Sequence, residues 1–367
     1  MTTHTAFQPS HGVFHSVGCA TLCLFVILAL PGRVRGQEQA TTTVKGFLDV
    51  YYLYSLTEHP LRDRSFTTQP LRHNEFNLNL GMIDVAYQAP SIRGRFALQT
   101  GTYVQANLAA ENALLKHVLE ASAGVRITEG VWVDLGIYPS HIGFEGIVSK
   151  DNWTYSRSLL SDYSPFYEAG LKISAALSDQ LSLSAHVLNG WQNIAETNDD
   201  KAVGTQLTYK PTDGVLLNWS TFAGNEQPDS AAARLRVFND LYAVVALSSS
   251  LSLAAVFDIG VQQRIDSDTY DTWHAAALML RHAFSDRWAA AARVEYFFDR
   301  TGVLVPTGTP DNFQTASASV NIDFAPTSMM LWRLEARLFN SKDPVYPTQT
   351  DMKKNDGFLV LSTAISM

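Results

Sequence analysis

Hydrophobic and polar residues alternate in short segments along most of the chain. In Thr315–Phe324 (TASASVNIDF), alanine, valine, isoleucine and phenylalanine alternate with serine, asparagine and aspartate. The same pattern recurs in Leu251–Val261, Leu181–Val187 and Met330–Phe339. Because successive side chains of a strand point to opposite faces, each segment predicts a strand with one apolar and one polar face.

The connections between these segments alternate between tight turns and long polar stretches. Turn-forming residues such as those of Lys210–Gly214 and Ala325–Ser328 make the tight ones. Seven tight turns and eight long loops join about sixteen strands, with a range of 14–18, and leave both chain ends on the tight-turn side. The long stretches lie near residues 56–72, 107–116, 141–164, 190–201, 223–233, 262–270, 299–313 and 340–356.

This arrangement predicts an all-β fold, a closed antiparallel transmembrane β-barrel. Short periplasmic turns and long extracellular loops are typical of outer-membrane barrels, which favour even strand numbers. An unpaired backbone group in lipid costs several kcal/mol, so a sheet with an apolar outer face must close on itself. About sixteen strands enclose a lumen wide enough for water.

The N-terminal segment predicts export. Residues Val17–Leu30 (VGCATLCLFVILAL) are apolar and uncharged, and small residues follow near Gly36. This length suits a signal peptide better than a membrane anchor, although no lysine or arginine precedes it. We therefore expect a cleaved signal peptide at residues 1–36 and one barrel domain at residues 37–367. Both cysteines, Cys19 and Cys23, would be removed with it.

Composition narrows the function classes. Charged residues make up 17% of the chain, a low fraction for a soluble domain, where about 25% is usual. The net charge of −8 argues against a nucleic-acid partner. The chain has no GxSxG, HExxH or phosphate-binding glycine motif, so we expect neither an enzyme nor a cofactor or metal. His186, His274 and His282 fall in separate strands and are interpreted as wall residues. Ser184 and His186 share a face, but no third partner for a hydrolase is visible.

Charged residues gather on the predicted inner face near the C-terminus. Two interpretations are compatible: a paired network that stiffens the wall, or an electrostatic field that selects permeating solutes. We predict that the pore is lined by Arg293, Glu295, Arg333, Glu335, Arg337, Asp258 and Asp323.

The stretch His141–Ser164 is the longest predicted loop and is rich in aromatic and charged residues. Loops of this length are usually functional or disordered. If its aromatic side chains pack on the inner wall, Glu145, Arg157 or Asp162 would stand at a constriction. The alternative is a loop that covers the outer rim.

Several short stretches resemble the OmpL-like β-barrel porin family. They occur in the order that this family shows, and the resemblance covers nearly all of the mature chain: Gly46–Tyr52 (GFLDVYY), His73–Asn79 (HNEFNLN), Asn152–Leu160 (NWTYSRSLL), Pro165–Gly170 (PFYEAG) and Leu188–Trp191 (LNGW). The resemblance implies an outer-membrane barrel with a porin function, and it implies no particular cargo.

The expected function is that of an outer-membrane porin for passive or weakly selective diffusion of small hydrophilic solutes. The alternative is a non-conducting outer-membrane receptor or adhesin that works through its long loops. The expected partners are membrane lipid, the outer-membrane assembly machinery and small hydrophilic solutes. Sixteen-stranded porins are commonly trimers, so analogy at the level of the fold suggests a homo-trimer.

Overall fold

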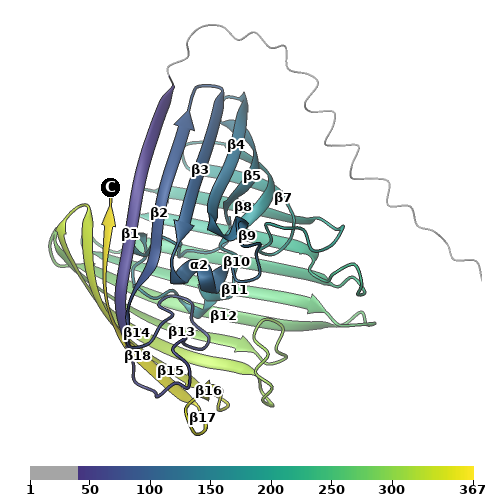
Figure 1. Ribbon diagram of the computed structural model, residues 1–367. Helices are drawn as coiled ribbons and strands as arrows, with labels where there is room; N and C mark the ends of the chain where they lie inside the picture. The colour runs from purple at the N-terminus through teal and green to yellow at the C-terminus, as the bar shows by residue number, and fades with distance from the viewer. Residues whose placement is uncertain (1–39) are drawn as a thin grey trace, which may run out of the picture. The chain divides into compact units, whose positions relative to one another are not determined.

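A computed structural model describes residues 40–367, and the predicted signal peptide lies outside these residues. Sixteen antiparallel strands form one closed barrel in which neighbours in sequence pair with each other (Figure 1). The strands are β1 Thr41–Ser55, β2 Phe76–Gln88, β3 Ile92–Thr100, β4 Val118–Thr128, β5 Val131–Pro139, β6 Tyr167–Ala176, β7 Leu181–Leu188, β8 Ala202–Thr212, β9 Val215–Asn225, β10 Leu235–Ala246, β11 Leu251–Gln263, β12 Tyr270–Ala283, β13 Trp288–Asp299, β14 Phe313–Thr327, β15 Met330–Ser341 and β18 Asn355–Ser366. The predicted strand number, connections and closure are confirmed.

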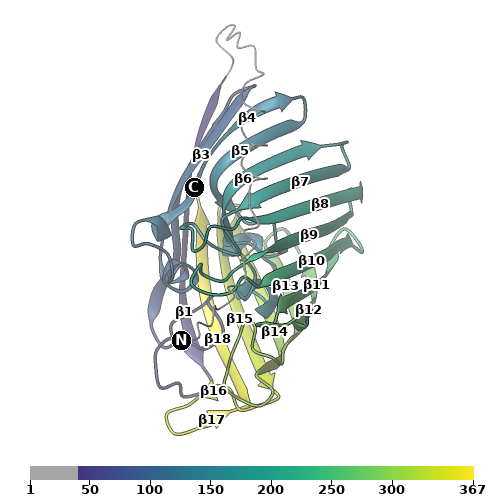
Figure 2. The same ribbon diagram turned by 90° about the vertical axis from the view of Figure 1, so that its right-hand side faces the viewer.

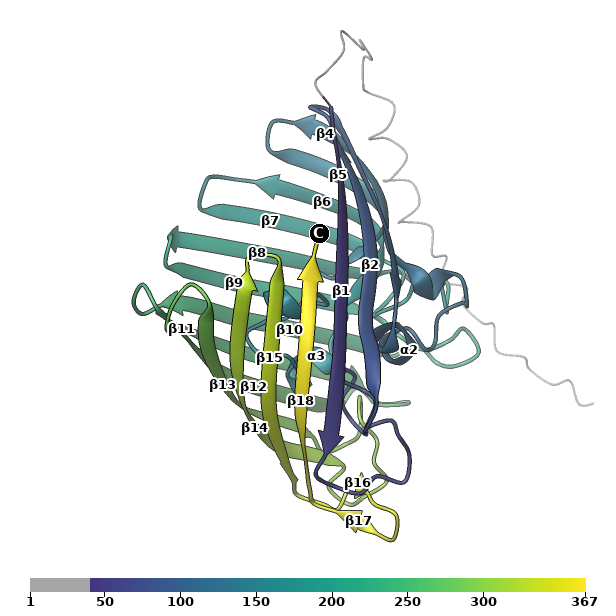
Figure 3. The ribbon, with the colours of Figure 1, turned by 60° about the vertical axis from the view of Figure 1, so that its left-hand side comes forward.

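The barrel closes between its first and last strands. β1 pairs with β18 from Phe47↔Ser366 to Ser55↔Phe358, and β18 also pairs with β15. Figure 3 shows β1 in purple beside β18 in yellow. The seam leaves no strand edge open, as a membrane-spanning sheet requires.

Shorter elements lie in the long loops. Helix α2 (Thr102–Asn107) and a 3-10 turn (Leu115–His117) join β3 to β4, and a second 3-10 turn (Ser149–Asp151) and helix α3 (Leu159–Asp162) lie between β5 and β6. A small hairpin of β16 (Tyr346–Pro347) and β17 (Met352–Lys353) lies between β15 and β18. Among residues 40–367, no helix is long and apolar enough to cross a membrane.

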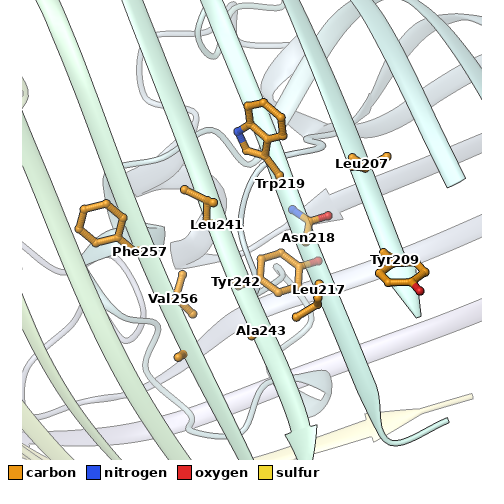
Figure 4. A pocket seen from close by; sticks show the side chains of 11 residues that line it. Leu207, Tyr209, Leu217, Asn218, Trp219, Leu241, Tyr242, Ala243, Val256 and Phe257 are labelled. Atoms are coloured by element: carbon orange, nitrogen blue, oxygen red, sulfur yellow. The ribbon is translucent and has the colours of Figure 1, made fainter. Parts of the chain in front are cut away.

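The outer face of the barrel is apolar. Leu207, Trp219, Leu241 and Phe257 are register neighbours across β8 to β11, and they line a shallow open groove on this face (Figure 4). Trp219, Leu241 and Phe257 each remain 42–48% exposed. Apolar side chains exposed in this way face lipid in a membrane barrel, so we assign this groove to the lipid-facing surface.

The inner face is polar and buried. Around the barrel, inward positions of the strands carry polar residues that are each 0% exposed: Asp49 on β1, Asn79 on β2, Ser220 on β9, Asp240 on β10 and Glu335 on β15. A polar face in the wall of a wide barrel would meet water, so something must cover it. The loop between β5 and β6 covers much of it, as described below. The strands themselves follow one another around the wall in Figure 2.

Candidate functional site: a loop held inside the barrel

The loop between β5 and β6, residues 140–166, lies inside the barrel, and we call it the lumen loop. Tyr155 donates its hydroxyl hydrogen to Asp49 on β1 over 3.2 Å. On the other side, the His141 ring lies 2.9 Å from the carbonyl oxygen of Thr221 on β9. β1 and β9 are half a circumference apart in the strand order, so the lumen loop bridges the lumen. Of the two alternatives from the sequence, the structure has the loop that packs on the inner wall.

The lumen loop also runs deep along the barrel axis. The Lys150 ammonium group donates to the carbonyl oxygen of Ser328 over 2.6 Å and lies 3.3 Å from Ser366 Oγ. Ser328 lies in the tight turn between β14 and β15, so the loop reaches the tight-turn rim. Thr154, Ser156 and Arg157 in this loop are 0% exposed.

Five inward side chains on β13 and β15 form a cluster that holds the lumen loop, and we call it the charge cluster: Arg293, Glu295, Arg333, Glu335 and Arg337. Between them runs β14, whose Ser317 and Ser319 are small enough for the long side chains to meet above them. Arg337 pairs with Glu295 at 2.5 Å, and Arg293 lies 3.4 Å from the same carboxylate. All five are at most 6% exposed.

The charge cluster binds the backbone of the lumen loop. Glu335 accepts from Ser156 N at 2.7 Å and Ser156 Oγ at 2.6 Å. Glu295 accepts from the Leu159 amide at 2.6 Å. Charge-assisted bonds of this kind are stronger than bonds between neutral groups. The lumen loop is therefore fixed by the wall at several consecutive residues.

The three arginines donate to carbonyl oxygens of the lumen loop. Arg293 donates to the Ser156 carbonyl and Arg337 to the Arg157 carbonyl, both at 2.7 Å. Arg333 donates to the Asn152 carbonyl at 2.5 Å and also reaches the carbonyl of Ser149. Five donors in a rigid fork suit arginine to such multiple contacts.

The two aspartates of the predicted lining lie apart from each other. Asp323 on β14 pairs with Arg333 at 2.9 Å and thus joins the edge of the charge cluster. Asp258 on β11 stands opposite Asp240 on β10. Asp240 accepts from the Gly143 amide of the lumen loop at 3.1 Å. Both aspartates are buried, and their role in permeation stays a prediction.

The three constriction candidates are buried within the lumen loop. Glu145 accepts from Arg293 at 3.1 Å and from the Ser158 amide at 2.7 Å. Arg157 pairs with Asp162 at 3.0 Å and lies over the Phe166 ring at 3.8 Å. Burial raises the pKa of the Asp162 carboxyl, against the opposing effect of Arg157 and Thr68. These contacts stabilise the folded loop, and a role in a constriction stays a prediction.

Sequence reasoning missed a second group of charges on the inner wall. Arg93 on β3 pairs with Asp134 on β5 at 2.5 Å. Arg95 on β3 pairs with Asp84 on β2 and Glu120 on β4, each at 2.9 Å. The two arginine side chains stay 31% and 40% exposed, unlike those of the charge cluster. Their alternation in Ile92–Thr100 was the signal that could have found them.

A histidine–glutamate group was also missed. The ring of His141 lies 2.8 Å from the Glu168 carboxylate on β6. Burial lowers the pKa of His141, but the nearby carboxylate raises it by more, so the pKa is raised overall. Ser184 Oγ lies 2.8 Å from His186 Nε2, while Glu168 lies 3.7 Å from His186 Nδ1. Glu168 is therefore close to the Ser184–His186 pair, for which the sequence showed no third partner. Its distance of 3.7 Å from His186 exceeds hydrogen-bond length. Glu168 is also already bound by His141 and Ser140.

Comparisons with solved structures support the fold. The anion-selective porin from Comamonas acidovorans matches with a TM-score of 0.61 and 9% identity over 90% of this chain and 100% of that one. The outer membrane channel DcaP of Acinetobacter baumannii matches with a TM-score of 0.61 and 11% identity over 90% and 99%. Salmonella typhi OmpF, in complex with daunomycin, matches with a TM-score of 0.56 and 14% identity over 89% and 97%.

The sequence comparison gives the family. A comparison with curated proteins finds no significant match. The family model described as "Putative beta-barrel porin-2, OmpL-like" matches residues 41–367, which are all but the first of the described residues. The family model supports an outer-membrane porin in general, and the solved neighbours support the barrel fold. The chain belongs to the OmpL-like β-barrel porin-2 family, as its sequence motifs indicated.

Proposed function

We propose that the protein is an outer-membrane porin through which small hydrophilic solutes diffuse passively or with weak selectivity. One observation carries the proposal: a closed barrel of sixteen strands has a polar inner wall and holds a long loop inside its lumen. A barrel of this size without its loops encloses a water-filled channel. The lumen loop then determines how much of that channel is open.

We assign the charge cluster a role in this constriction. Arg293, Arg337 and Glu335 bind the lumen loop directly. Burying so many charges is costly unless every one is paired, and apolar packing would often be more stable. We infer that the pairing serves to fix one loop position, while Arg93 and Arg95 supply charge to the accessible lumen.

We also propose how the protein is exported, inserted and assembled. The protein would be exported by a cleaved signal peptide at residues 1–36, inserted by the outer-membrane assembly machinery, surrounded by lipid and assembled as a homo-trimer. No nucleic acid takes part. The proposal contains no catalytic reaction, because Ser184 and His186 are interpreted as polar residues of the wall.

Liposome swelling tests the proposal. Folded protein reconstituted into liposomes should accelerate swelling in small uncharged sugars, and the rate should fall as the sugar becomes larger. Protein-free liposomes give the baseline. Swelling at the baseline rate for every sugar would contradict a porin function.

The loop held inside the lumen favours one alternative, a non-conducting receptor or adhesin that uses the long loops. Its expected behaviour differs when the lumen loop is shortened. A porin is permeable as the wild type and becomes more permeable when this loop is shortened. A receptor gives baseline swelling as the wild type, and its surface binding stays because its exposed loops are intact. The swelling assay on the wild type and on the loop-shortened variant therefore separates the two functions.

A further inference from the structure

Three side chains with metal-binding chemistry meet in the wall near the start of the lumen loop. His141 comes from the loop, Glu168 from β6 and His186 from β7. One ligand atom of each lies within 4.8 Å of the others. They are 6%, 0% and 4% exposed, so water reaches none of them freely.

The outer contacts of the two imidazole rings orient them toward Glu168. Nε2 of His141 lies 2.9 Å from the Thr221 carbonyl oxygen, and Nε2 of His186 lies 2.8 Å from Ser184 Oγ. Both Nδ1 atoms are thereby directed to the carboxylate, at 2.8 Å and 3.7 Å. Metal-binding histidines almost always have their other ring nitrogen held by an acceptor of this kind.

Neighbouring residues orient the Glu168 carboxylate and leave space for the His141 ring. Ser140 Oγ donates to Glu168 at 2.8 Å, which orients the carboxylate. Gly204 on β8 leaves room for the His141 ring, since a Cβ atom there would lie 2.5 Å from it. His141 thus reaches the wall through a gap that any larger residue would fill.

The donor set indicates the class of ion. Two imidazole nitrogens and one carboxylate form a ligand set that suits zinc and related transition ions, whereas calcium and magnesium favour oxygen alone. Around Zn²⁺ with bonds of about 2.0–2.1 Å, tetrahedral ligand atoms lie roughly 3.3 Å apart. The ligand atoms lie within 4.8 Å of one another, and the two imidazole rings stack with centroids 4.2 Å apart and 21° between their planes. Binding therefore requires one ring to turn and the ligands to move closer, and His141 lies on a loop. The Tyr138 hydroxyl, 3.5 Å from His186 Nδ1, is available as the fourth ligand.

We propose that His141, Glu168 and His186 bind one divalent transition-metal ion of the Zn²⁺ class, and that the ion fastens the lumen loop to the barrel wall. Without the ion, His141 donates from both ring nitrogens, to Thr221 and to Glu168. The ion takes the place of the proton on Nδ1, and this proton leaves to solvent as the ion binds. His141 is the second residue of the lumen loop, so the bond acts where the loop leaves β5.

Zinc titration of the folded full barrel in detergent tests this proposal. Protein freed of metal by a chelator should bind one Zn²⁺ ion per chain by calorimetry, and Co²⁺ in its place should give the visible absorption of a four-coordinate site. His141→Ala and His186→Ala should abolish both signals. Ser184→Ala, which removes only an outer contact, should weaken binding about 10–100-fold. His282→Ala, on an exposed side chain, is the matched control and should change nothing.

The variants also guard against a misfolding artefact. His141 lies outside the strands, so His141→Ala leaves every wall ladder intact, and heat-modifiable migration verifies the fold. In the wild type, Zn²⁺ should slow tryptic cleavage of the lumen loop, and in His141→Ala it should not. The proposal is overturned if folded wild type takes up no Zn²⁺, or if its uptake is the same in both histidine variants.

Discussion

At the residue scale, each arginine of the charge cluster donates to at least one backbone carbonyl of the lumen loop. Arg293, Arg333 and Arg337 contact the carbonyls of Ser156, Asn152 and Arg157 in turn. Backbone carbonyls do not change with the side chain, so the wall recognises the path of the loop more than its sequence. The carboxylates beside the arginines balance their charge.

Removing one of these arginines should release the lumen loop. Arg293→Met removes the ion-pair partner of Glu145 and of Glu335. Breaking a buried ion pair typically lowers the stability of the folded state by about 3–5 kcal/mol. Trypsin should then cut rapidly after Lys150 or Arg157, which are protected in the wild type. Arg287→Met, at an exposed turn position, serves as the control. Equal protection of all three proteins would contradict the assigned role of Arg293.

A single added methyl group should displace the start of the loop. In Gly204→Ala, the new Cβ would lie 2.5 Å from the His141 ring, and overpacking of this kind costs about 1–3 kcal/mol. Tryptic protection of the lumen loop should fall. Gly146→Ala is the matched control, because a Cβ there meets nothing within 4 Å. If both variants are protected alike, His141 does not anchor the loop.

Alternation predicted which wall residues face inward but not what they touch. Arg293, Glu295 and Glu335 are on the inner face because of their position in a strand of period two. Their partners Ser156 and Leu159 lie in a loop without a repeating hydrophobic pattern. No pattern in the sequence therefore indicated which loop residue meets which wall residue. The group of His141, Glu168 and His186 was missed for the same reason: one of its three members lies in that loop.

At the element scale, the lumen loop is a separate unit laid into a complete wall. Every barrel strand has a hydrogen-bonded neighbour on both sides without it. Its length and aromatic content indicated a functional loop, and the sequence left open whether it would enter the barrel. The contacts of Tyr155 with β1, of His141 with β9 on the opposite side, and of Lys150 with the tight-turn rim decide this.

Shortening this loop should leave the barrel folded. Replacing residues 144–163 by a short Gly-Ser linker exposes the charge cluster to water, which solvates charges well, and it leaves every strand ladder in place. Circular dichroism should keep its β signal. Replacement of the exposed residues 230–233 is the control. A loss of folded protein in the first variant alone would mean that the wall depends on the loop.

At the scale of the whole molecule, counting turns was enough to predict closure. Tight turns and long loops alternate without a break, and the physics of lipid then requires a closed sheet. The strand pair at the seam, β1 with β18, joins residues more than three hundred positions apart. Such a pairing follows from closure, and no local pattern shows it.

Removing the last strand should abolish the folded barrel. Deletion of residues 355–367 takes away the only strand that pairs with both β1 and β15 among residues 40–367, and it leaves two open edges. The wild type should migrate faster in gels before boiling than after it, and the truncated protein should not. A heat-modifiable band in the truncated protein would contradict closure through this seam.

Single-channel conductance in a planar bilayer shows directly whether the barrel conducts ions and whether the lumen loop restricts them. Wild type and the variant that lacks residues 144–163 are measured side by side. We expect discrete conductance steps for folded wild type and a severalfold larger step for the shortened variant, because the lumen loop occupies the path of the ions. The variant altered at residues 230–233 should conduct like the wild type. Folded, heat-modifiable protein that never conducts, even without its lumen loop, would contradict a porin function.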